Sequence, residues 1–143
     1  MNGNAVDRER RVFDAVPLSA RAARQFVTER LRSSGAPVAV VGDYSLVVSE
    51  LVTNVIEHSE GSHVEIILGL DDPLWWELEV VGGRPAAPKR MLAPELWTVA
   101  SAHEVSGRGL GIVRQLMDDV VTDIGTDRVS VRCRRYRDGH AAD

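Results

Sequence analysis

The chain has 143 residues, of which 44% are hydrophobic and 27% are charged, a balance typical of soluble globular proteins. This length favours a single domain over residues 1–143 that buries a core without metals or disulfides. The net charge of −4 and a pI near 5.6 argue against a general electrostatic attraction to nucleic acid or to an anionic membrane.

Cysteine and histidine usage gives no sign of disulfides or of a structural metal site. Cys133 is the single cysteine and lies in a strand-like run, which favours a reducing compartment. His58, His63, His103 and His140 have no partner Cys or Asp at zinc-like spacing. Because we find no signal-peptide core and no long apolar segment, we expect a cytoplasmic protein.

The first elements predicted are a strand and a helix. Alternating residues over 10–16 favour the strand, which Pro17 closes. Ser19 stands at an N-cap position before the run 20–31, which is rich in helix-forming residues. The Ser-Ser-Gly sequence at 33–35 then ends this helix.

A second helix follows a short connection over 36–42, with Asp43 as its expected N-cap and its end near Glu60. At about 100° per residue, Glu50 and Asn54 are neighbours on its polar side. A carboxylate and a carboxamide so placed can address one ligand, although a solvated helix face explains the same residues. The apolar residues gather on the opposite arc, namely Tyr44, Val48, Leu51, Val52, Val55 and Ile56.

A β-hairpin is predicted next, from two β-rich runs over 63–70 and 74–81 that Asp71-Asp72-Pro73 separates. In the second run, Glu77 and Glu79 alternate with apolar residues. We therefore expect one face of the hairpin to be wet and the other to be buried.

From Gly82 to about Gly107 the sequence has no regular period, apart from one short helix expected over 94–100. A connection of this length inside a compact domain is usually functional or mobile. Two further strands over 120–124 and 128–136 complete the chain. The element order predicts an α+β fold, a two-layer sandwich with a mostly antiparallel sheet and the helices on one face.

The long connection ends in a glycine-rich turn, Gly107-Arg108-Gly109-Leu110-Gly111, that leads into a helix. Glycines at alternate positions let backbone N–H groups approach an anion, and the helix N-terminus adds its own N–H groups and positive dipole end. Arg108 offers a charge-assisted contact. A tight turn explains the same glycines. A Walker loop is absent, and Ile112 stands where a dinucleotide fingerprint requires glycine.

The combination of Glu50-x-x-x-Asn54 on a helix, a hairpin, a long connection and Gly107-x-Gly109-x-Gly111 resembles the GHKL superfamily of ATP-binding proteins, which have the Bergerat fold. The small size is similar to that of the bacterial anti-sigma-factor serine kinases, the switch proteins of partner-switching regulation. The resemblance covers about residues 10–136, and its most specific part is Leu51-Val-Thr-Asn-Val-Ile-Glu-His58.

The resemblance implies a role for each matching residue. Asn54 would hold the Mg²⁺ that bridges the phosphates of ATP, and Glu50 would act as the general base on an acceptor serine. The five residues from Gly107 to Gly111 would wrap the triphosphate, and the connection 82–106 would form a mobile lid. The implied partners are a sigma factor, an anti-anti-sigma protein with a STAS domain, and a second copy of the chain.

One departure concerns the residue that would read the base. After the second hairpin strand the family carries an Asp that accepts a hydrogen bond from the adenine amino group, with a Gly two residues later. Here those positions are Gly82 and Arg84. A hydrogen bond to a charged group contributes about 1.5–3 kcal/mol, so binding should be weakened roughly tenfold to a hundredfold. The alignment predicts that Gly82→Asp tightens ATP binding.

The sequence therefore leaves functions of different classes open. The first is an ATP- and Mg²⁺-dependent protein serine kinase that also sequesters a sigma factor. The second is a binding module of the same fold that has lost efficient ATP use and regulates transcription only by sequestering a protein partner. Gly82 separates these two. In a remoter alternative the fold binds another nucleotide or none, and Glu50 and Asn54 are merely solvated.

Overall fold

The computed structural model describes residues 8–85 and 105–137 of the chain. The short helix expected over 94–100 and most of the expected lid lie outside these residues. Within them, five antiparallel strands form one sheet in the order β1-β2-β3-β5-β4. The strands are β1 (Arg8–Asp14), β2 (His63–Gly69), β3 (Trp75–Gly82), β4 (Asp119–Ile124) and β5 (Val129–Tyr136).

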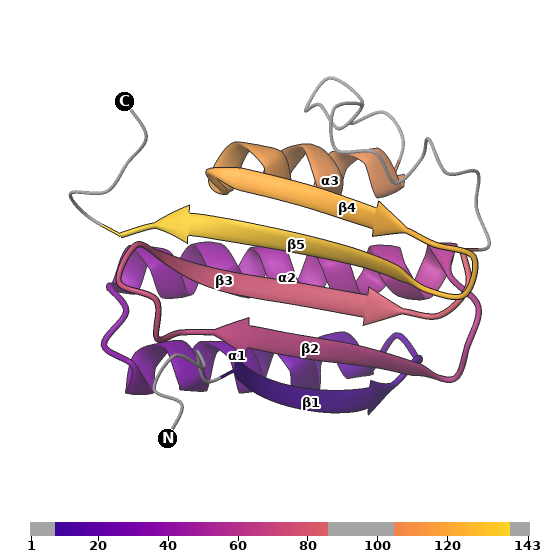
Figure 1. The fold of residues 1–143 in the computed structure, drawn as a ribbon, viewed down its shortest axis with the longest axis horizontal. Helices are drawn as coiled ribbons and strands as arrows, with labels where there is room; N and C mark the ends of the chain where they lie inside the picture. Colours follow the sequence, from indigo (N-terminus) through magenta and orange to yellow (C-terminus); the bar gives the residue numbers. More distant parts are fainter. Residues whose placement is uncertain (1–7, 86–104, 138–143) are drawn as a thin grey trace.

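Three helices cover one face of this sheet (Figure 1). They are α1 (Ser19–Ser33), α2 (Val38–His58) and α3 (Val105–Leu116). The predicted hairpin of β2 and β3 is present, and the two further predicted strands, β4 and β5, also pair with each other, with β5 between β3 and β4. The predicted α+β sandwich with helices on one face is confirmed.

Helix α2 is the central element of the helical layer. It contacts α1, α3, β3 and β5 because its apolar arc belongs to the core that the inward side chains of the strands complete. The Tyr44 hydroxyl donates a hydrogen bond to the Trp76 carbonyl oxygen at 2.6 Å, and burial raises the pKa of Tyr44. Contrary to the sequence expectation, α2 is long and apolar enough for a membrane span, but half of that stretch is buried inside the domain. We attribute its apolarity to core packing.

The starts of α1 and α2 differ from the prediction. Helix α2 begins at Val38, and Pro37 is its N-cap residue, so the expected cap at Asp43 is wrong. Proline suits this position because it needs no backbone N–H there. Asp43 instead lies in the second turn, where its carboxylate accepts a hydrogen bond from Arg135. Ser19 is likewise the first residue of α1 and not its cap, since no side chain caps that helix.

The glycine-rich segment is part of a helix and not of a turn before it. Helix α3 begins at Val105, so Gly107, Gly109 and Gly111 fall within its first two turns. Glycine inside a helix lowers stability by roughly 0.5–1 kcal/mol relative to alanine. For this reason the sequence favours a turn over a helix here. The contact of α3 with α2 offsets this cost by packing.

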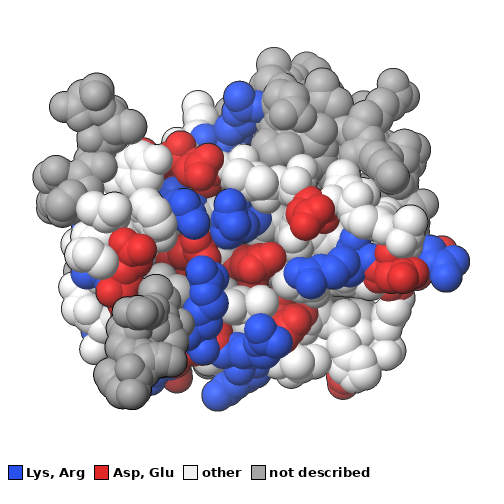
Figure 2. Space-filling view, in the orientation of Figure 1, with Lys and Arg blue, Asp and Glu red and all other residues white. Residues whose placement is uncertain are grey.

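The face of the sheet away from the helices carries charges of both signs (Figure 2). Register places Arg134 opposite Glu77 on neighbouring strands. Arg134 Nε lies 2.7 Å and Arg8 Nη1 2.5 Å from the two Glu77 carboxylate oxygens, and only 2% of Glu77 is exposed. The expectation of a wet Glu77 is therefore wrong: alternation identifies its face, but the arginines cover it. Burial raises the pKa of Glu77, yet the hydrogen bonds from Arg134 and Arg8 outweigh it and hold the pKa below its ordinary value.

Candidate functional site

Helix α2 presents Glu50 and Asn54 on its side toward α3. Arg135, the partner of Asp43, also donates a hydrogen bond to the Leu116 carbonyl oxygen of α3, which identifies this side of the helix. Glu50 and Asn54 follow Asp43 by seven and eleven residues, so each falls within about 20° of Asp43 around the axis, on opposite sides of it, and the two lie about 40° apart. Because α2 and α3 run antiparallel (Figure 1), the C-terminal half of α2 lies beside the start of α3.

The side chain of Asn54 is buried, and both of its polar atoms are unpaired within residues 8–85 and 105–137. Its exposed fraction is 3%, and neither Oδ1 nor Nδ2 has a hydrogen-bond partner among the described residues. Buried polar atoms are almost always paired in folded proteins, and each exception calls for a reason, such as a ligand or an ion. A carboxamide oxygen is a ligand that Mg²⁺ accepts. The side chain therefore fits the metal that the resemblance implies.

A metal at Asn54 would depend on its substrate for further ligands. Within residues 8–85 and 105–137, no three His, Cys, Asp or Glu side chains gather to hold a metal ion. Mg²⁺ in nucleotide sites is commonly held by one or two protein groups together with phosphate oxygens and water. The donor set around Asn54 therefore suits a magnesium ion that arrives with a polyphosphate.

Glu50 lies one helical turn before Asn54 and is partly buried. Among the described residues its carboxylate has no ion-pair or hydrogen-bond partner. The backbone of α3 offers less than the predicted glycine loop. In a helix that begins at Val105, the first four N–H groups lack intrahelical partners, a set that includes Gly107 but not Gly109 or Gly111.

Gly82, where the resemblance expects a base-reading carboxylate, packs closely against α2. A Cβ atom added to Gly82 would lie 2.4 Å from Val55 Cγ1 and 2.6 Å from Ser59 Oγ. Both separations are shorter than any ordinary carbon contact. A side chain at Gly82 does not fit, so the residues present do not supply the base-reading carboxylate that the resemblance expects here.

The contact continues beyond Gly82 as a seam, which we define as residues 82–85 packed along 55–60. A Cβ at Gly83 would lie 2.0 Å from the Glu60 carbonyl oxygen. The Glu60 N–H donates to the Arg84 carbonyl oxygen at 2.7 Å, and Ser59 forms an antiparallel bridge with Pro85. Glycine at 82 and 83 therefore permits two backbones to touch.

The sequence predicts that Gly82 lacks the expected carboxylate, but it does not predict the side chains that pack against this position. The sequence pattern places Val55 on the apolar arc of its helix and predicts no role for Ser59. Their spacing of four residues places them on one side of α2, a signal for a joint contact. The identity of that contact depends on how β3 ends against the helix, which local patterns do not encode.

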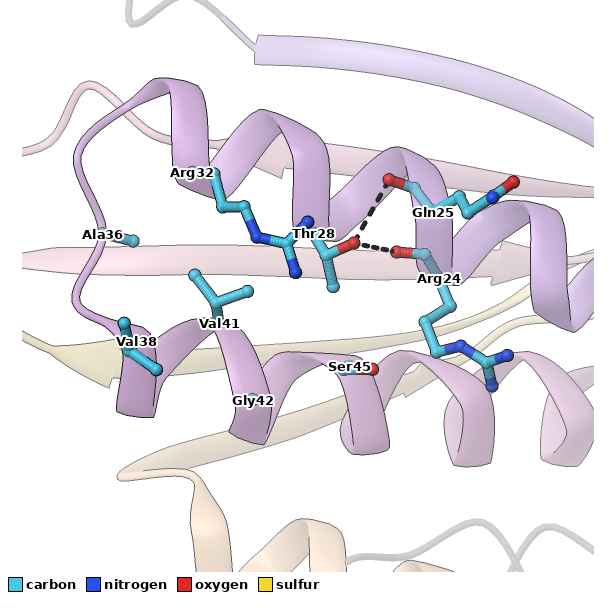
Figure 3. Close-up of a pocket in the computed structure, with 9 residues that line it drawn as sticks. All are labelled: Arg24, Gln25, Thr28, Arg32, Ala36, Val38, Val41, Gly42 and Ser45. Carbon is cyan, nitrogen blue, oxygen red and sulfur yellow. Dashed lines mark hydrogen bonds between the residues drawn. The ribbon is translucent and has the colours of Figure 1, made fainter.

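A cleft of about 530 Å³ lies on another side of α2, against α1 (Figure 3). Thr28 donates its hydroxyl to the carbonyl oxygen of Arg24 at 2.9 Å, and Arg24 donates to Ser49 at 3.2 Å. No carboxylate, histidine or cysteine lines the cleft, so it contains no acid–base pair. Its lining comprises Arg24, Gln25, Thr28, Arg32, Ala36, Val38, Val41, Gly42 and Ser45.

Comparison with known families finds a match over most of the chain. The model of a family described as "Histidine kinase-like ATPase domain" matches residues 13–134. This range includes Glu50, Asn54, Gly82 and the glycine-rich start of α3. No curated protein shows a significant match to the chain.

Proposed function

The chain belongs to the histidine kinase-like ATPase domain family, and from this membership and the geometry at Asn54 we propose that it binds a Mg²⁺–nucleoside triphosphate and phosphorylates a serine of a partner protein. The observation that carries the proposal is the buried carboxamide of Asn54, both of whose polar atoms lack partners among the described residues. A folded domain keeps such a group when a ligand completes it.

Glu50 supplies the acid–base chemistry in this proposal. Its carboxylate accepts the proton of the serine hydroxyl as the serine oxygen bonds to the γ-phosphorus and the bond from that phosphorus to the β-phosphate oxygen breaks. ADP leaves, and the proton remains on Glu50 until it passes to solvent. The single helical turn between Glu50 and Asn54 places proton acceptor and metal ligand side by side.

We further propose that the chain acts in the cytoplasm as an anti-sigma-factor type of regulator, whose phosphate acceptor is an anti-anti-sigma protein with a STAS domain. The resemblance in size and motifs supports this setting. A sigma factor is the second proposed partner, and a homodimer the proposed assembly.

The test is phosphate transfer from γ-labelled Mg-ATP to a STAS protein encoded beside the chain. Glu50→Gln should slow transfer about 10²- to 10⁴-fold, the usual contribution of a general base, while nucleotide binding measured by calorimetry stays near the wild-type value. Glu57→Gln is the matched control, because Glu57 is exposed on the same helix. Absence of transfer by the wild type with its cognate partner would refute the kinase proposal.

The seam favours a second candidate, a module that regulates by binding a protein partner without using ATP. Its support is the contact of Gly82 with Val55 and Ser59, which excludes a base-reading carboxylate. In this case millimolar Mg-ATP gives no heat of binding, and Asn54→Ala sequesters the sigma factor as well as the wild type does. Loss of sequestration on removal of nucleotide would contradict this candidate.

A further inference from the structure

We propose that the cleft between α1 and α2 is a second binding site, which takes a small molecule with two carboxylate groups at the ends of an apolar body. Figure 3 shows this cleft and its lining. The inference is independent of the proposed nucleotide binding, because neither Glu50 nor Asn54 lines the cleft.

The first step concerns charge. Arg24 and Arg32 both extend from α1 toward α2 (Figure 3), and no carboxylate lines the cleft between them. Within residues 8–85 and 105–137 neither arginine forms an ion pair, whereas Arg30 of the same helix pairs with Glu9. The chain as a whole carries a net charge of −4. Two guanidinium groups without acidic neighbours therefore form a local positive site that favours an anion.

The second step concerns the hydrogen bonds that the cleft leaves open. The Thr28 hydroxyl already donates to the carbonyl oxygen of Arg24 at 2.9 Å. Arg24 Nη1 donates to Ser49 Oγ at 3.2 Å, which uses one of the five N–H groups that a guanidinium offers. A ligand in the cleft thus meets mainly charged donors and must supply acceptors. Carboxylates accept in pairs from a guanidinium, so they match these donors in both charge and geometry.

The third step concerns the shape of the cleft. Its volume of about 530 Å³ lies within the range of about 300–1,000 Å³ that small-molecule sites occupy. Its floor includes Val41, which is only 6% exposed, and an added Cβ at Gly42 would meet nothing within 4 Å. Arg24 and Arg32 are eight residues apart on one helix, which separates them by about 12 Å along the axis. The cleft therefore suits an apolar body with a carboxylate toward each arginine.

The experiment is calorimetric titration of the wild-type chain with sebacate, a linear dicarboxylate chosen to match the separation of about 12 Å. Its monomethyl ester keeps the length but loses one charge, and should bind at least about tenfold more weakly. Succinate is too short to reach both arginines and should also bind at least about tenfold more weakly. Equal affinities for the three probes, or no binding of sebacate, would overturn the proposal. Tighter binding of a short peptide with a glutamate at each end would overturn the assignment to a small molecule.

A first set of variants tests the two arginines. Arg24→Gln and Arg32→Gln should each weaken sebacate binding at least about tenfold. The matched control is Arg21→Gln, which makes the same change of charge at an exposed position of α1 outside the lining of the cleft. It should leave the dissociation constant of sebacate near the wild-type value. Equal weakening by all three variants would mean a general electrostatic attraction to α1 and would overturn the proposal.

A second set tests the location of the site. Gly42→Leu adds a side chain where the cleft is open and should abolish sebacate binding, whereas Ala39→Leu, at an exposed position of α2 outside the lining, should not. Circular dichroism checks that both variants fold. Asn54→Ala should leave sebacate binding unchanged, so failure of this proposal and failure of the proposed nucleotide binding are distinguishable. Loss of sebacate binding in Asn54→Ala but not in Gly42→Leu would overturn the assignment to this cleft.

Discussion

Glu77 and Asn54 are both buried polar residues, yet their side chains differ in hydrogen bonding. On the open sheet face, Glu77 is 2% exposed and receives hydrogen bonds from Arg8 and Arg134. On the side of α2 toward α3, Asn54 is 3% exposed and has no partner among the described residues. A buried polar group that the fold has satisfied contributes to structure, whereas one left unsatisfied is available to a ligand.

The largest effect is expected from removing the satisfied group. Glu77→Ala leaves Arg134 and Arg8 without their carboxylate, and breaking a buried pair in this way costs about 3–5 kcal/mol. Both arginines reach water, so we expect a loss of unfolding free energy of about 2–3 kcal/mol, measured by urea denaturation at neutral pH. The control is Glu79→Ala on the same strand and face, whose partner Arg128 is 3.7 Å away and largely exposed. Equal losses for the two variants would contradict this account.

The same carboxylate should make stability depend on pH. The pKa of Glu77 is lower in the folded protein than its ordinary value. Its contribution to stability is therefore complete above the unfolded pKa and is lost as the pH falls through the folded pKa. The difference in unfolding free energy between wild type and Glu77→Gln should shrink steadily in acid below about pH 4.5. A difference that stays constant from pH 7 to pH 3 would show that Glu77 is not ionised in its pair.

Gly82→Asp should disrupt the seam. The sequence alone predicts tighter ATP binding, but the structure leaves no room for the side chain beside Val55 and Ser59. We expect a loss of about 1–3 kcal/mol, as for other overpacked interiors, with no gain in ATP affinity. Gly42→Asp is the matched control, because an added Cβ there meets nothing within 4 Å. Tighter ATP binding by Gly82→Asp at unchanged stability would show that the seam opens readily.

The sequence predicts those features of the fold that depend on residues close together in the chain, and it fails for those that depend on distant ones. Periodicity identifies α2, the hairpin of β2 and β3, and the strands β4 and β5, because the repeat of buried and exposed positions is local. The sequence predicts too late a start for α2: it assigns 36–42 to a connection, whereas Val40 and Val41 are buried and belong to the helix. The burial of Glu77 depends on Arg8, which is 69 positions away in the chain. No local pattern reports such a contact.

In the candidate site, too, the sequence predicts local features but not tertiary contacts. The spacing of Glu50 and Asn54 is a property of one helix, so the sequence places them side by side. The sequence also shows directly that position 82 carries no carboxylate. That Val55 and Ser59 fill the space depends on how the end of β3 meets α2, a tertiary contact that the separate segments do not specify.

The smallest change in the free energy of unfolding is expected for a substitution of Asn54, and this substitution should stabilise the protein. Its two unpaired atoms are desolvated without compensation, at a cost of about 1–3 kcal/mol. Asn54→Leu removes that cost at similar volume, so the unfolding free energy should rise by about 1–2 kcal/mol while magnesium-dependent nucleotide binding is lost. Thr53→Leu, at the exposed neighbouring position, controls for added apolar surface and should change neither quantity much. A destabilised Asn54→Leu variant would mean that the carboxamide already has a structural partner in solution, and the contrast with Glu77 would not hold. Gain of stability with loss of binding is the pattern expected where function retains an unsatisfied group.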